Sequence, residues 1–348
     1  MRCPPLDARS YLKNYDFRYR ITTELKMSKI FKLAHTFNCF YLTEIKTRKC
    51  LPFFVGGFQV GLLQQHVITQ LLRYPQVFHI HDSYVELNPA FRDYNERSEQ
   101  VDRVLRELRD EKAFITLKGW REECYEVRTK YACKSLMKME RSATCLFGIK
   151  KYGVYINGYV RHPTKGLCIW LQQRSSTKQT WPDKWDNLVG GGLSVGYGIF
   201  ETAHKEANEE ASIPPELLKN LINIGTISFF YKCERGLFPN TEFVFDLELP
   251  LDFIPSNQDG EVQNFQLLTA DECLEKVLTP EFKLTSVPVV FDFFIRHGII
   301  NAETEPNYVE LIEMLHVPLQ TMYNNVLPNC TVNNSTLCEM KPENNIVH

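Results

Sequence analysis

The chain has 348 residues, of which 44% are hydrophobic and 12% aromatic, so it can fill a packed core and is not disordered throughout. Its 40 basic and 42 acidic residues are interleaved and leave a net charge of -2. This balance argues against nucleic acid as the main partner, because such proteins usually carry an excess of basic residues.

The sequence predicts neither a membrane span nor a secretory signal. The longest apolar stretch, Val287 to Ile295, is interrupted by Pro288 and Asp292 and is too short to cross a bilayer. The first residues lack an apolar core, so the expected location is the cytoplasm. No pair of the 11 cysteines has the Cys-x-x-Cys spacing of a zinc knuckle.

The first part of the chain predicts a small α+β domain. Residues 1–20 are polar and predict a flexible arm, and residues 21–142 form the expected domain. Within it, Gln59 to Arg73 and Ser98 to Asp110 have apolar residues at helical spacing. Val77 to Leu87, which lies between them, alternates as a strand does.

Residues 143–318 predict a second domain. Tyr152 to Val160 and Leu167 to Leu171 are strand-like runs separated by turn residues, which indicates a hairpin. A helix is expected from Ile199 to Ala211, before Pro214. Further strands are expected at Ile222 to Tyr231, Thr241 to Leu249 and Val262 to Leu268, and helices at Asp271 to Leu278 and Val287 to His297. Residues 319–348 are rich in Asn, Thr and Pro and predict a disordered tail.

The helix expected from Ile199 to Ala211 carries the residues that indicate chemistry. Glu206 precedes Glu209 and Glu210 by three and four residues, so the three carboxylates share one face. They repel one another, and Lys205 is the only basic residue nearby in sequence. Mg²⁺ suits such a face because it prefers carboxylate oxygens, water and phosphates. The pattern predicts a metal site, with a solvated acidic face as the alternative.

A glycine run, Gly190 to Gly192, precedes this helix. Glycine lets a backbone approach a ligand closely and adopt positive φ. Gly191 and Gly192 are therefore predicted to contact the substrate.

The glycine run and the helix together resemble the Nudix box, Gly-x5-Glu-x7-Arg-Glu-U-x-Glu-Glu-x-Gly-U, where U is an aliphatic residue. Glu206, Glu209 and Glu210 match the metal-binding glutamates of the box. At three positions the chain departs from the pattern, with Tyr197 for the first Glu, Lys205 for the Arg and Ser212 for the late Gly.

The resemblance extends to one branch of that family, the fungal and plant Nudix proteins with an N-terminal extension domain, once labelled thiamine-pyrophosphokinase-related. It covers about residues 20 to 315, and its segments include Gly119 to Glu123 with Tyr125, Gln173 to Lys178, Trp185 to Gly192, and Asp292 to Gly298. It implies an α+β protein in which a smaller N-terminal α+β domain precedes a Nudix fold, a mixed sheet between helices in an α/β/α sandwich. The implied activity is Mg²⁺-dependent hydrolysis of damaged thiamine diphosphates, such as oxothiamine and oxythiamine diphosphate, to the monophosphate. Mn²⁺ is the alternative cation.

A base must orient the attacking water in that reaction. Glu209 or Glu210 is one candidate for this role. Glu261 is the other, because its place after the late loop resembles the position of a further carboxylate in several Nudix enzymes. An ordinary turn residue after Asp259-Gly260 is an equal interpretation of Glu261.

Other polar residues near the box are predicted to bind the substrate. Arg174 would hold the diphosphate as a planar fork and Lys178 as a point charge. Asn187 would contact the organic part of the substrate or order the turn before the glycines. Trp181 and Trp185 would stack on a flat heterocycle or fill the core.

Three other functions are compatible with parts of the pattern. A diphosphate isomerase on the same fold needs a catalytic Cys, and none lies beside the glycine run. A kinase needs a phosphate-binding Gly-x4-Gly-Lys-Ser/Thr loop, which is absent from the sequence. A catalytically weak binding module on a Nudix scaffold would account for Tyr197 and Lys205. A small-molecule diphosphate is the expected partner, and the oligomeric state stays open.

Overall fold

The computed structural model describes residues 28–45 and 49–328, and the predicted arm at residues 1–20 lies outside these ranges. The strands are β1 (Cys50–Val55), β2 (Phe58–Gln64), β3 (Phe78–Ile80), β4 (Val85–Leu87), β5 (Cys124–Val127), β6 (Met137–Glu140), β7 (Lys151–His162), β8 (Gly166–Arg174), β9 (Trp185–Asn187), β10 (Val189–Gly192), β11 (Ile222–Cys233), β12 (Gly236–Glu248) and β13 (Val262–Thr269). The helices are α2 (Lys29–Phe37), α3 (Cys39–Thr43), α4 (Gln65–Leu71), α5 (Tyr94–Asp110), α6 (Ile199–Ala211), α7 (Pro215–Leu218), α8 (Ala270–Val277), α9 (Val287–Arg296), α10 (Tyr308–Met314) and α11 (Leu319–Met322), with a 3-10 turn at Ile115–Gly119. None of the helices in these ranges is long and apolar enough to cross a membrane.

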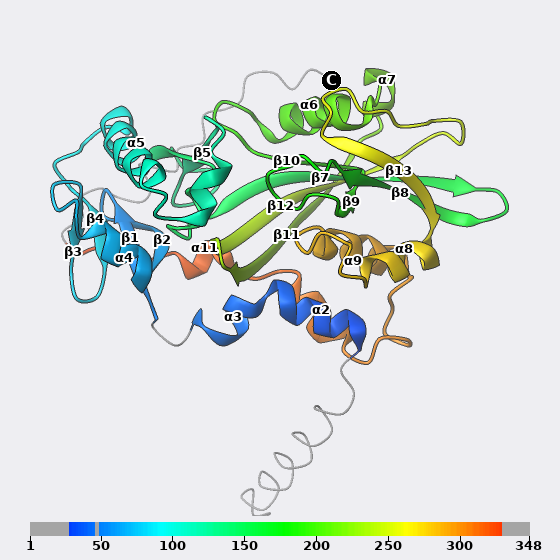
Figure 1. The fold of residues 1–348 in the computed structure, drawn as a ribbon. Helices are drawn as coiled ribbons and strands as arrows, with labels where there is room; N and C mark the ends of the chain where they lie inside the picture. Colours follow the sequence, from blue (N-terminus) through cyan, green and yellow to red (C-terminus); the bar gives the residue numbers. More distant parts are fainter. Residues whose placement is uncertain (1–27, 46–48, 329–348) are drawn as a thin grey trace, which may run out of the picture.

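A 7-stranded mixed sheet forms the centre of the second half of the chain. Its order is β11-β12-β7-β8-β13, with β10 paired to β7 and β9 to β8. The β12–β7 pair is parallel and the other pairs are antiparallel. Helix α6 lies over one face of this sheet, and helices α8 and α9 cover the other (Figure 1). This arrangement confirms the expected α+β class with a mixed sheet between helices.

Strand β7 lies between these two helical layers and is buried on both faces. Val154 and Ile156 point into the core under α6. Tyr155 and Tyr159 point into the opposite core, with Phe293 of α9. A strand that is buried on both sides needs apolar residues at consecutive positions, which explains the nearly continuous apolar run here.

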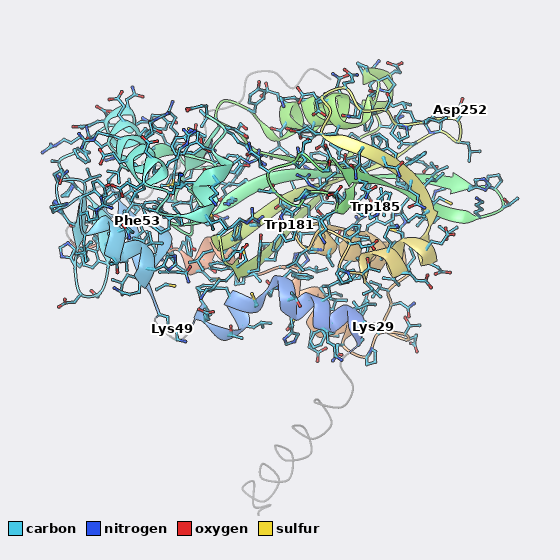
Figure 2. All side chains as sticks on the ribbon, viewed as in Figure 1. Lys29, Lys49, Phe53, Trp181, Trp185 and Asp252 are labelled. Atoms are coloured by element: carbon cyan, nitrogen blue, oxygen red, sulfur yellow. The ribbon has the colours of Figure 1, made fainter. Side chains whose placement is uncertain are left out.

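Residues 50–149, called the N-terminal unit below, contain a separate sheet with the order β2-β1-β4-β3. Helix α5 packs on its core through Val101, Val104 and Leu108, and Phe53 lies at the centre of this core. In Figure 2, Phe53 lies in this unit, whereas Trp181 and Trp185 lie along the large sheet. The N-terminal unit also contains the two-stranded sheet β5-β6.

The structure corrects two expectations. Residues 59–64 are the strand β2 and not the start of a helix; every residue from Phe58 to Leu63 is buried, so the segment shows neither the alternation of a half-buried strand nor a one-sided helical face. Helices α2 and α3, which lie within the predicted N-terminal domain, also pack on the core of the large sheet through residues such as Phe37 and Phe40. Residues 319–328 are not a disordered tail, because Leu319 and Tyr323 are buried; residues 329–348 lie outside the described ranges. The domain boundary near residue 142 stays a prediction.

Candidate active site

Helix α6 presents its glutamates to strand β10 because both elements have small residues where they meet. The buried face of α6 consists of Ala203, Ala207 and Ala211, which lie against the core below β10. A Cβ at Gly191 would overlap the side chain of Glu206. The alanines and the glycine therefore allow an approach that larger side chains would block, and they bring Glu206 onto the strand.

Glu210 is bound to the same strand and is almost wholly buried. Its Oε2 accepts hydrogen bonds from the backbone N–H of Gly190 at 2.9 Å and from Nε2 of Gln172 at 3.0 Å. Burial, followed by repulsion from Glu206, raises the pKa of Glu210 to about 7. Within the described ranges, Oε1 of Gln172 is buried without a hydrogen-bond partner. The carboxyl group of Glu210 therefore lies in a buried polar space, near a second carboxyl group and an amide that has an unpaired oxygen within the described ranges.

Lys205 contacts the other two glutamates of the helix. Its Nζ lies 2.6 Å from Oε2 of Glu209 and 3.4 Å from Oε1 of Glu206. Burial raises the pKa of Glu206, although Lys205 opposes this effect. Lys205 replaces the arginine of the Nudix box, and in this arrangement it turns Glu209 toward itself.

Glu206 and Glu210 fit a hard divalent cation. No three or more His, Cys, Asp or Glu side chains in the described part of the chain already stand as a metal-binding group. However, Glu206 lies against Gly191 and Glu210 accepts the N–H of Gly190, and burial raises the pKa of both carboxyl groups. Two carboxylates in such a setting are the oxygen donors that Mg²⁺ or Mn²⁺ takes. Glu209 would join them only after release from Lys205.

Ser212 shows why the last departure from the Nudix box is tolerated. It ends helix α6 with φ 49° and ψ 40°, a left-handed conformation that favours glycine. Its Oγ donates a hydrogen bond to the carbonyl of Ser256 at 2.7 Å and accepts one from Nε2 of Gln258 at 3.1 Å. The serine therefore fastens the loop that leads to Glu261, a contact that glycine cannot make.

This loop brings Glu261 to the end of helix α6. The backbone N–H of Gln258 donates to the carbonyl of Glu209 at 3.0 Å. The carboxylate of Glu261 forms an ion pair with Lys178. Burial and the charge of Arg174 lower the pKa of Lys178 to about 8, whereas Glu210 acts in the opposite direction. The predicted residues Lys178 and Glu261 thus lie near the glutamates of α6.

Two other predicted ligands are held inside the fold. Arg174 donates to the carbonyls of Thr180 at 3.1 Å and Trp181 at 3.2 Å, and to Asp186 at 3.3 Å. Asn187 is 1% exposed, and its Nδ2 donates to Oδ1 of Asn157 at 2.6 Å. Asn187 therefore does not reach the surface of the site. The guanidinium of Arg174 is buried and is held by the carbonyls of Thr180 and Trp181.

The tryptophans are divided between the two predicted uses. Trp185 is buried in the core below the sheet, with Nζ of Lys276 4.3 Å from its ring centre. Trp181 is half-buried, and the guanidinium of Arg235 lies 5.7 Å from its ring centre. Only Trp181 has a face that can meet a ligand.

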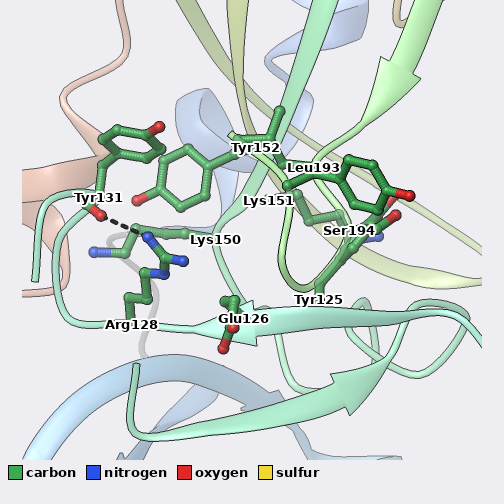
Figure 3. A pocket seen from close by; sticks show the side chains of 10 residues that line it. Tyr125, Glu126, Arg128, Tyr131, Lys150, Lys151, Tyr152, Leu193 and Ser194 are labelled. Carbon is green, nitrogen blue, oxygen red and sulfur yellow. Dashed lines mark hydrogen bonds between the residues drawn. The ribbon is translucent and has the colours of Figure 1, made fainter. Parts of the chain in front are cut away.

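A pocket lies between the N-terminal unit and the loop that joins β10 to α6. Its empty volume is about 390 Å³, part of it open to solvent. Tyr125, Arg128 and Lys150 line it together with Leu193 and Ser194 of that loop (Figure 3). Tyr197, which replaces the first glutamate of the box, also belongs to its wall. Sequence spacing did not reveal this contribution of the N-terminal unit.

Comparison with known proteins agrees with this geometry. A family model described as NUDIX domain matches residues 151–287, and one described as a domain of unknown function, DUF4743, matches residues 29–151. The chain is 34% identical over 274 residues to Nudix hydrolase 24, chloroplastic, of Arabidopsis thaliana, which covers 78% of this chain and 73% of the relative. The chain belongs to the Nudix hydrolase family. It is therefore a Nudix hydrolase, an enzyme that acts on diphosphate-containing substrates, and the kinase, isomerase and binding-module alternatives lose their support.

Other similar proteins say less about the activity. Uncharacterized protein YJR142W of Saccharomyces cerevisiae is 34% identical over 286 residues, which is 76% of this chain and 83% of the yeast protein. The structure of the E. coli dihydroneopterin triphosphate pyrophosphohydrolase matches 42% of this chain and 95% of that chain, at 23% identity and a TM-score of 0.33. That likeness is too low to inform the function of this Nudix hydrolase. The plant relative is named chloroplastic, so the expected cytoplasmic location stays a prediction.

Proposed function

We propose that this Nudix hydrolase cleaves a thiamine-type diphosphate, with damaged forms such as oxothiamine and oxythiamine diphosphate as its preferred substrates. The products would be the monophosphate and phosphate. The resemblance to the thiamine-pyrophosphokinase-related branch supports the substrate class, and the glutamates of α6 support the reaction.

The observation that carries the hydrolytic site is the position of Glu206 and Glu210 against the glycine strand. Two carboxyl groups share one polar space, and Glu210 accepts the N–H of Gly190. Mg²⁺, or Mn²⁺ in its place, would be held by these oxygens and would neutralise charge on the diphosphate and on the departing phosphate. We assign Glu206 and Glu210 as metal ligands and Glu209 as a further ligand or base.

The reaction needs a carboxylate that takes a proton from water. Water adds to the terminal phosphorus while the bond from that phosphorus to the bridging oxygen breaks, and the bridging oxygen leaves with the monophosphate. We assign the proton to Glu261 or to one of Glu209 and Glu210. Glu261 is supported by its ion pair with Lys178, which holds the carboxylate near helix α6. Lys178 is also assigned to the diphosphate, which it would contact as a point charge.

Phosphate release from a panel of diphosphates tests this proposal. With Mg²⁺, we expect oxythiamine and oxothiamine diphosphate to give a higher kcat/KM than thiamine diphosphate or ADP. Glu206→Gln should lower the rate on every substrate by about 100-fold or more, because it removes a metal ligand.

Glu216→Gln is the matched control, because Glu216 is an exposed glutamate on the next helix, α7. It should leave all rates unchanged. Equal or faster release from ADP than from the thiamine-type compounds would overturn the substrate assignment. Full activity of Glu206→Gln would overturn the metal assignment.

A further inference from the structure

The N-terminal unit reaches the loop that carries the Nudix box. The backbone N–H of Val195 donates to the carbonyl of Cys124 on strand β5 at 3.0 Å, and Ser194 donates through its Oγ to the carboxylate of Glu123. A Cβ at Gly192 would overlap the hydroxyl of Tyr125. Figure 3 shows Tyr125 of β5 beside Ser194 of this loop. Strand β5 therefore forms one wall of the loop between the glycine run and helix α6.

Arg141 directly follows strand β6, the partner of β5, and its side chain packs on this wall. Its Nη1 lies 2.7 Å from Oε2 of Glu123, and its guanidinium lies 5.5 Å from the ring centre of Tyr125. Burial disfavours the charge of Arg141, but Tyr125 and Glu123 outweigh burial and raise its pKa. Tyr125 meets Gly192 and Glu206 meets Gly191, so Arg141 and Glu206 lie at neighbouring residues of β10, and Glu206 adds to the rise in the pKa of Arg141.

Arg121 lies at the same end of this wall, two residues before Glu123, whose carbonyl accepts the backbone N–H of Arg141 at 2.8 Å. Its Nε donates to Oε1 of Gln179 at 2.9 Å, on the loop that follows β8. No ion pair joins Arg121 to an acidic side chain of residues 28–45 or 49–328, and its two Nη groups donate no hydrogen bond there. Burial, then the charges of Arg141 and Arg174, lower the pKa of Arg121. The half-buried guanidinium of Arg121 is thus held beside other cations, and most of its N–H groups donate no hydrogen bond within the described ranges.

These cations converge with Lys178. Arg174 lowers the pKa of Lys178 after burial, and Arg121 and Arg141 lower it further. Arg174, Arg141 and Lys178 already pair with Asp186, Glu123 and Glu261. Arg121, which contacts Gln179 next to Lys178, pairs with no carboxylate of the described residues, so its charge beside these cations favours an additional anion. Arginine in particular presents parallel N–H groups that match phosphate oxygens in pairs. The residues that surround the glutamates of α6 are therefore arranged for an anion with several oxygens.

We propose that Arg121 and Arg141 of the N-terminal unit complete the diphosphate-binding site of the Nudix domain. The domain of unknown function is then a part of the active site, and its arginines bind phosphoryl oxygens of the substrate opposite Glu206 and Glu210. Arg141 is held for this role by Glu123, and Arg121 by Gln179. This inference rests on the proposed placement of the reacting diphosphate beside helix α6, but not on the identity of the organic group.

Binding of methylenediphosphonate, a diphosphate analogue that water does not cleave, tests the inference without catalysis. Isothermal titration of the full chain with this probe and Mg²⁺ should show binding that Arg121→Gln weakens by about tenfold or more. Arg121→Lys keeps the charge but not the planar fork, so it should lose less affinity than Arg121→Gln. Arg103→Gln is the matched control, because Arg103 is exposed on helix α5 of the same unit, and it should bind as the wild type does.

Arg141 is tested by Arg141→Lys, which keeps a positive charge beside Glu123. It should weaken binding of methylenediphosphonate while the thermal midpoint of the protein stays close to that of the wild type. In the hydrolysis assay, both Arg121→Gln and Arg141→Lys should raise KM for every diphosphate in the panel, since they contact the group that all these substrates share.

The outcomes separate this inference from the proposed substrate. Binding by Arg121→Gln within twofold of the wild type would overturn the inference, as would a wild-type chain that does not bind the probe. If the wild type binds the probe and Arg121→Gln does not, while no thiamine-type diphosphate is cleaved, the inference stands and the substrate assignment fails. If thiamine-type diphosphates are cleaved equally by both proteins, the substrate assignment stands and the inference fails.

Discussion

Asp186 and Glu210 are buried and Glu206 is half-buried in the same Nudix domain, but the surroundings of Asp186 and of the two glutamates shift their pKa values in opposite directions. Asp186 is 0% exposed and accepts hydrogen bonds from Nζ of Lys283 at 2.7 Å and from Oγ of Ser286. Burial alone would raise the pKa of Asp186, but Lys283 and Arg174 outweigh it, so the pKa is lowered.

The glutamates of helix α6 are compensated less, because the ion pair of Glu206 with Lys205 and the hydrogen bonds to Glu210 do not outweigh burial. Burial raises the pKa of both Glu206 and Glu210, and Glu206 adds to the effect on Glu210. A buried carboxylate whose charge is compensated by neighbouring cations holds strands and helices together. A pair of carboxyl groups whose charge is not fully compensated is suited to a cation from outside the chain. The contrast supports a structural role for Asp186 and agrees with the proposed role of Glu206 and Glu210 as metal ligands.

The largest expected effect concerns the compensated carboxylate. Asp186→Asn leaves Lys283 and Arg174 without their carboxylate, so the free energy of unfolding should fall by about 3–5 kcal/mol. Urea denaturation measures this change. Asp102→Asn breaks the exposed pair with Arg106 on helix α5 and should cost less than about 1 kcal/mol. Equal losses in the two variants would remove the distinction between Asp186 and an ordinary surface pair.

The second prediction concerns the incompletely compensated pair. Glu210→Gln should lower the rate of phosphate release by about 100-fold or more, because it removes a proposed metal ligand. The same variant should keep the thermal midpoint of the wild type or raise it, because a neutral amide replaces an acid that is costly to ionise and can still accept the N–H of Gly190. A large loss of stability with little loss of activity would place Glu210 with Asp186 among the structural acids.

A third buried acid sharpens the comparison through pH. Burial raises the pKa of Glu242 from 4.5 to about 7, against a hydrogen bond from Asn240. Because the folded protein binds this proton more tightly than the unfolded chain, stability is complete below about pH 4.5 and falls as the pH rises to about 7. Glu242→Gln should remove that fall and stabilise the protein at pH 8 by up to about 3.5 kcal/mol, at roughly 1.4 kcal/mol per pKa unit. Thermal melts of both proteins at pH 5 and pH 8 measure it, and the same pH dependence in the variant would contradict the assignment.

Much of the second domain could be predicted from the sequence because its elements have strong local signals. Helix α6 extends from Ile199 to Ala211 as expected, with Glu206 three residues before Glu209 on one surface. The hairpin of β7 and β8 also follows the expected runs, which are separated by turn residues. These features depend on neighbours in sequence, so periodicity and turn composition are sufficient to find them.

Other features depend on contacts that local patterns do not encode. Strand β2 is buried on both faces, which removes the alternation that would have distinguished it from a helix. Leu319 and Tyr323 are buried because distant residues, such as Phe230, cover them. The hydrogen bond that holds Asn187 to Asn157, 30 positions earlier in the chain, likewise has no local signature. The approach of Arg121 to Gln179, 58 positions later in the chain, has no signature in spacing at all.

The hydrogen bond from Val195 to Cys124 has a consequence for how such an enzyme diversifies. Through this bond, the loop between the glycine run and helix α6 is held by a strand that belongs to the first half of the chain. Recombination that exchanged this half would leave helix α6 and its glutamates intact, yet it would replace the wall that faces them. A lineage can in this way acquire new substrates while it inherits its hydrolytic residues unchanged.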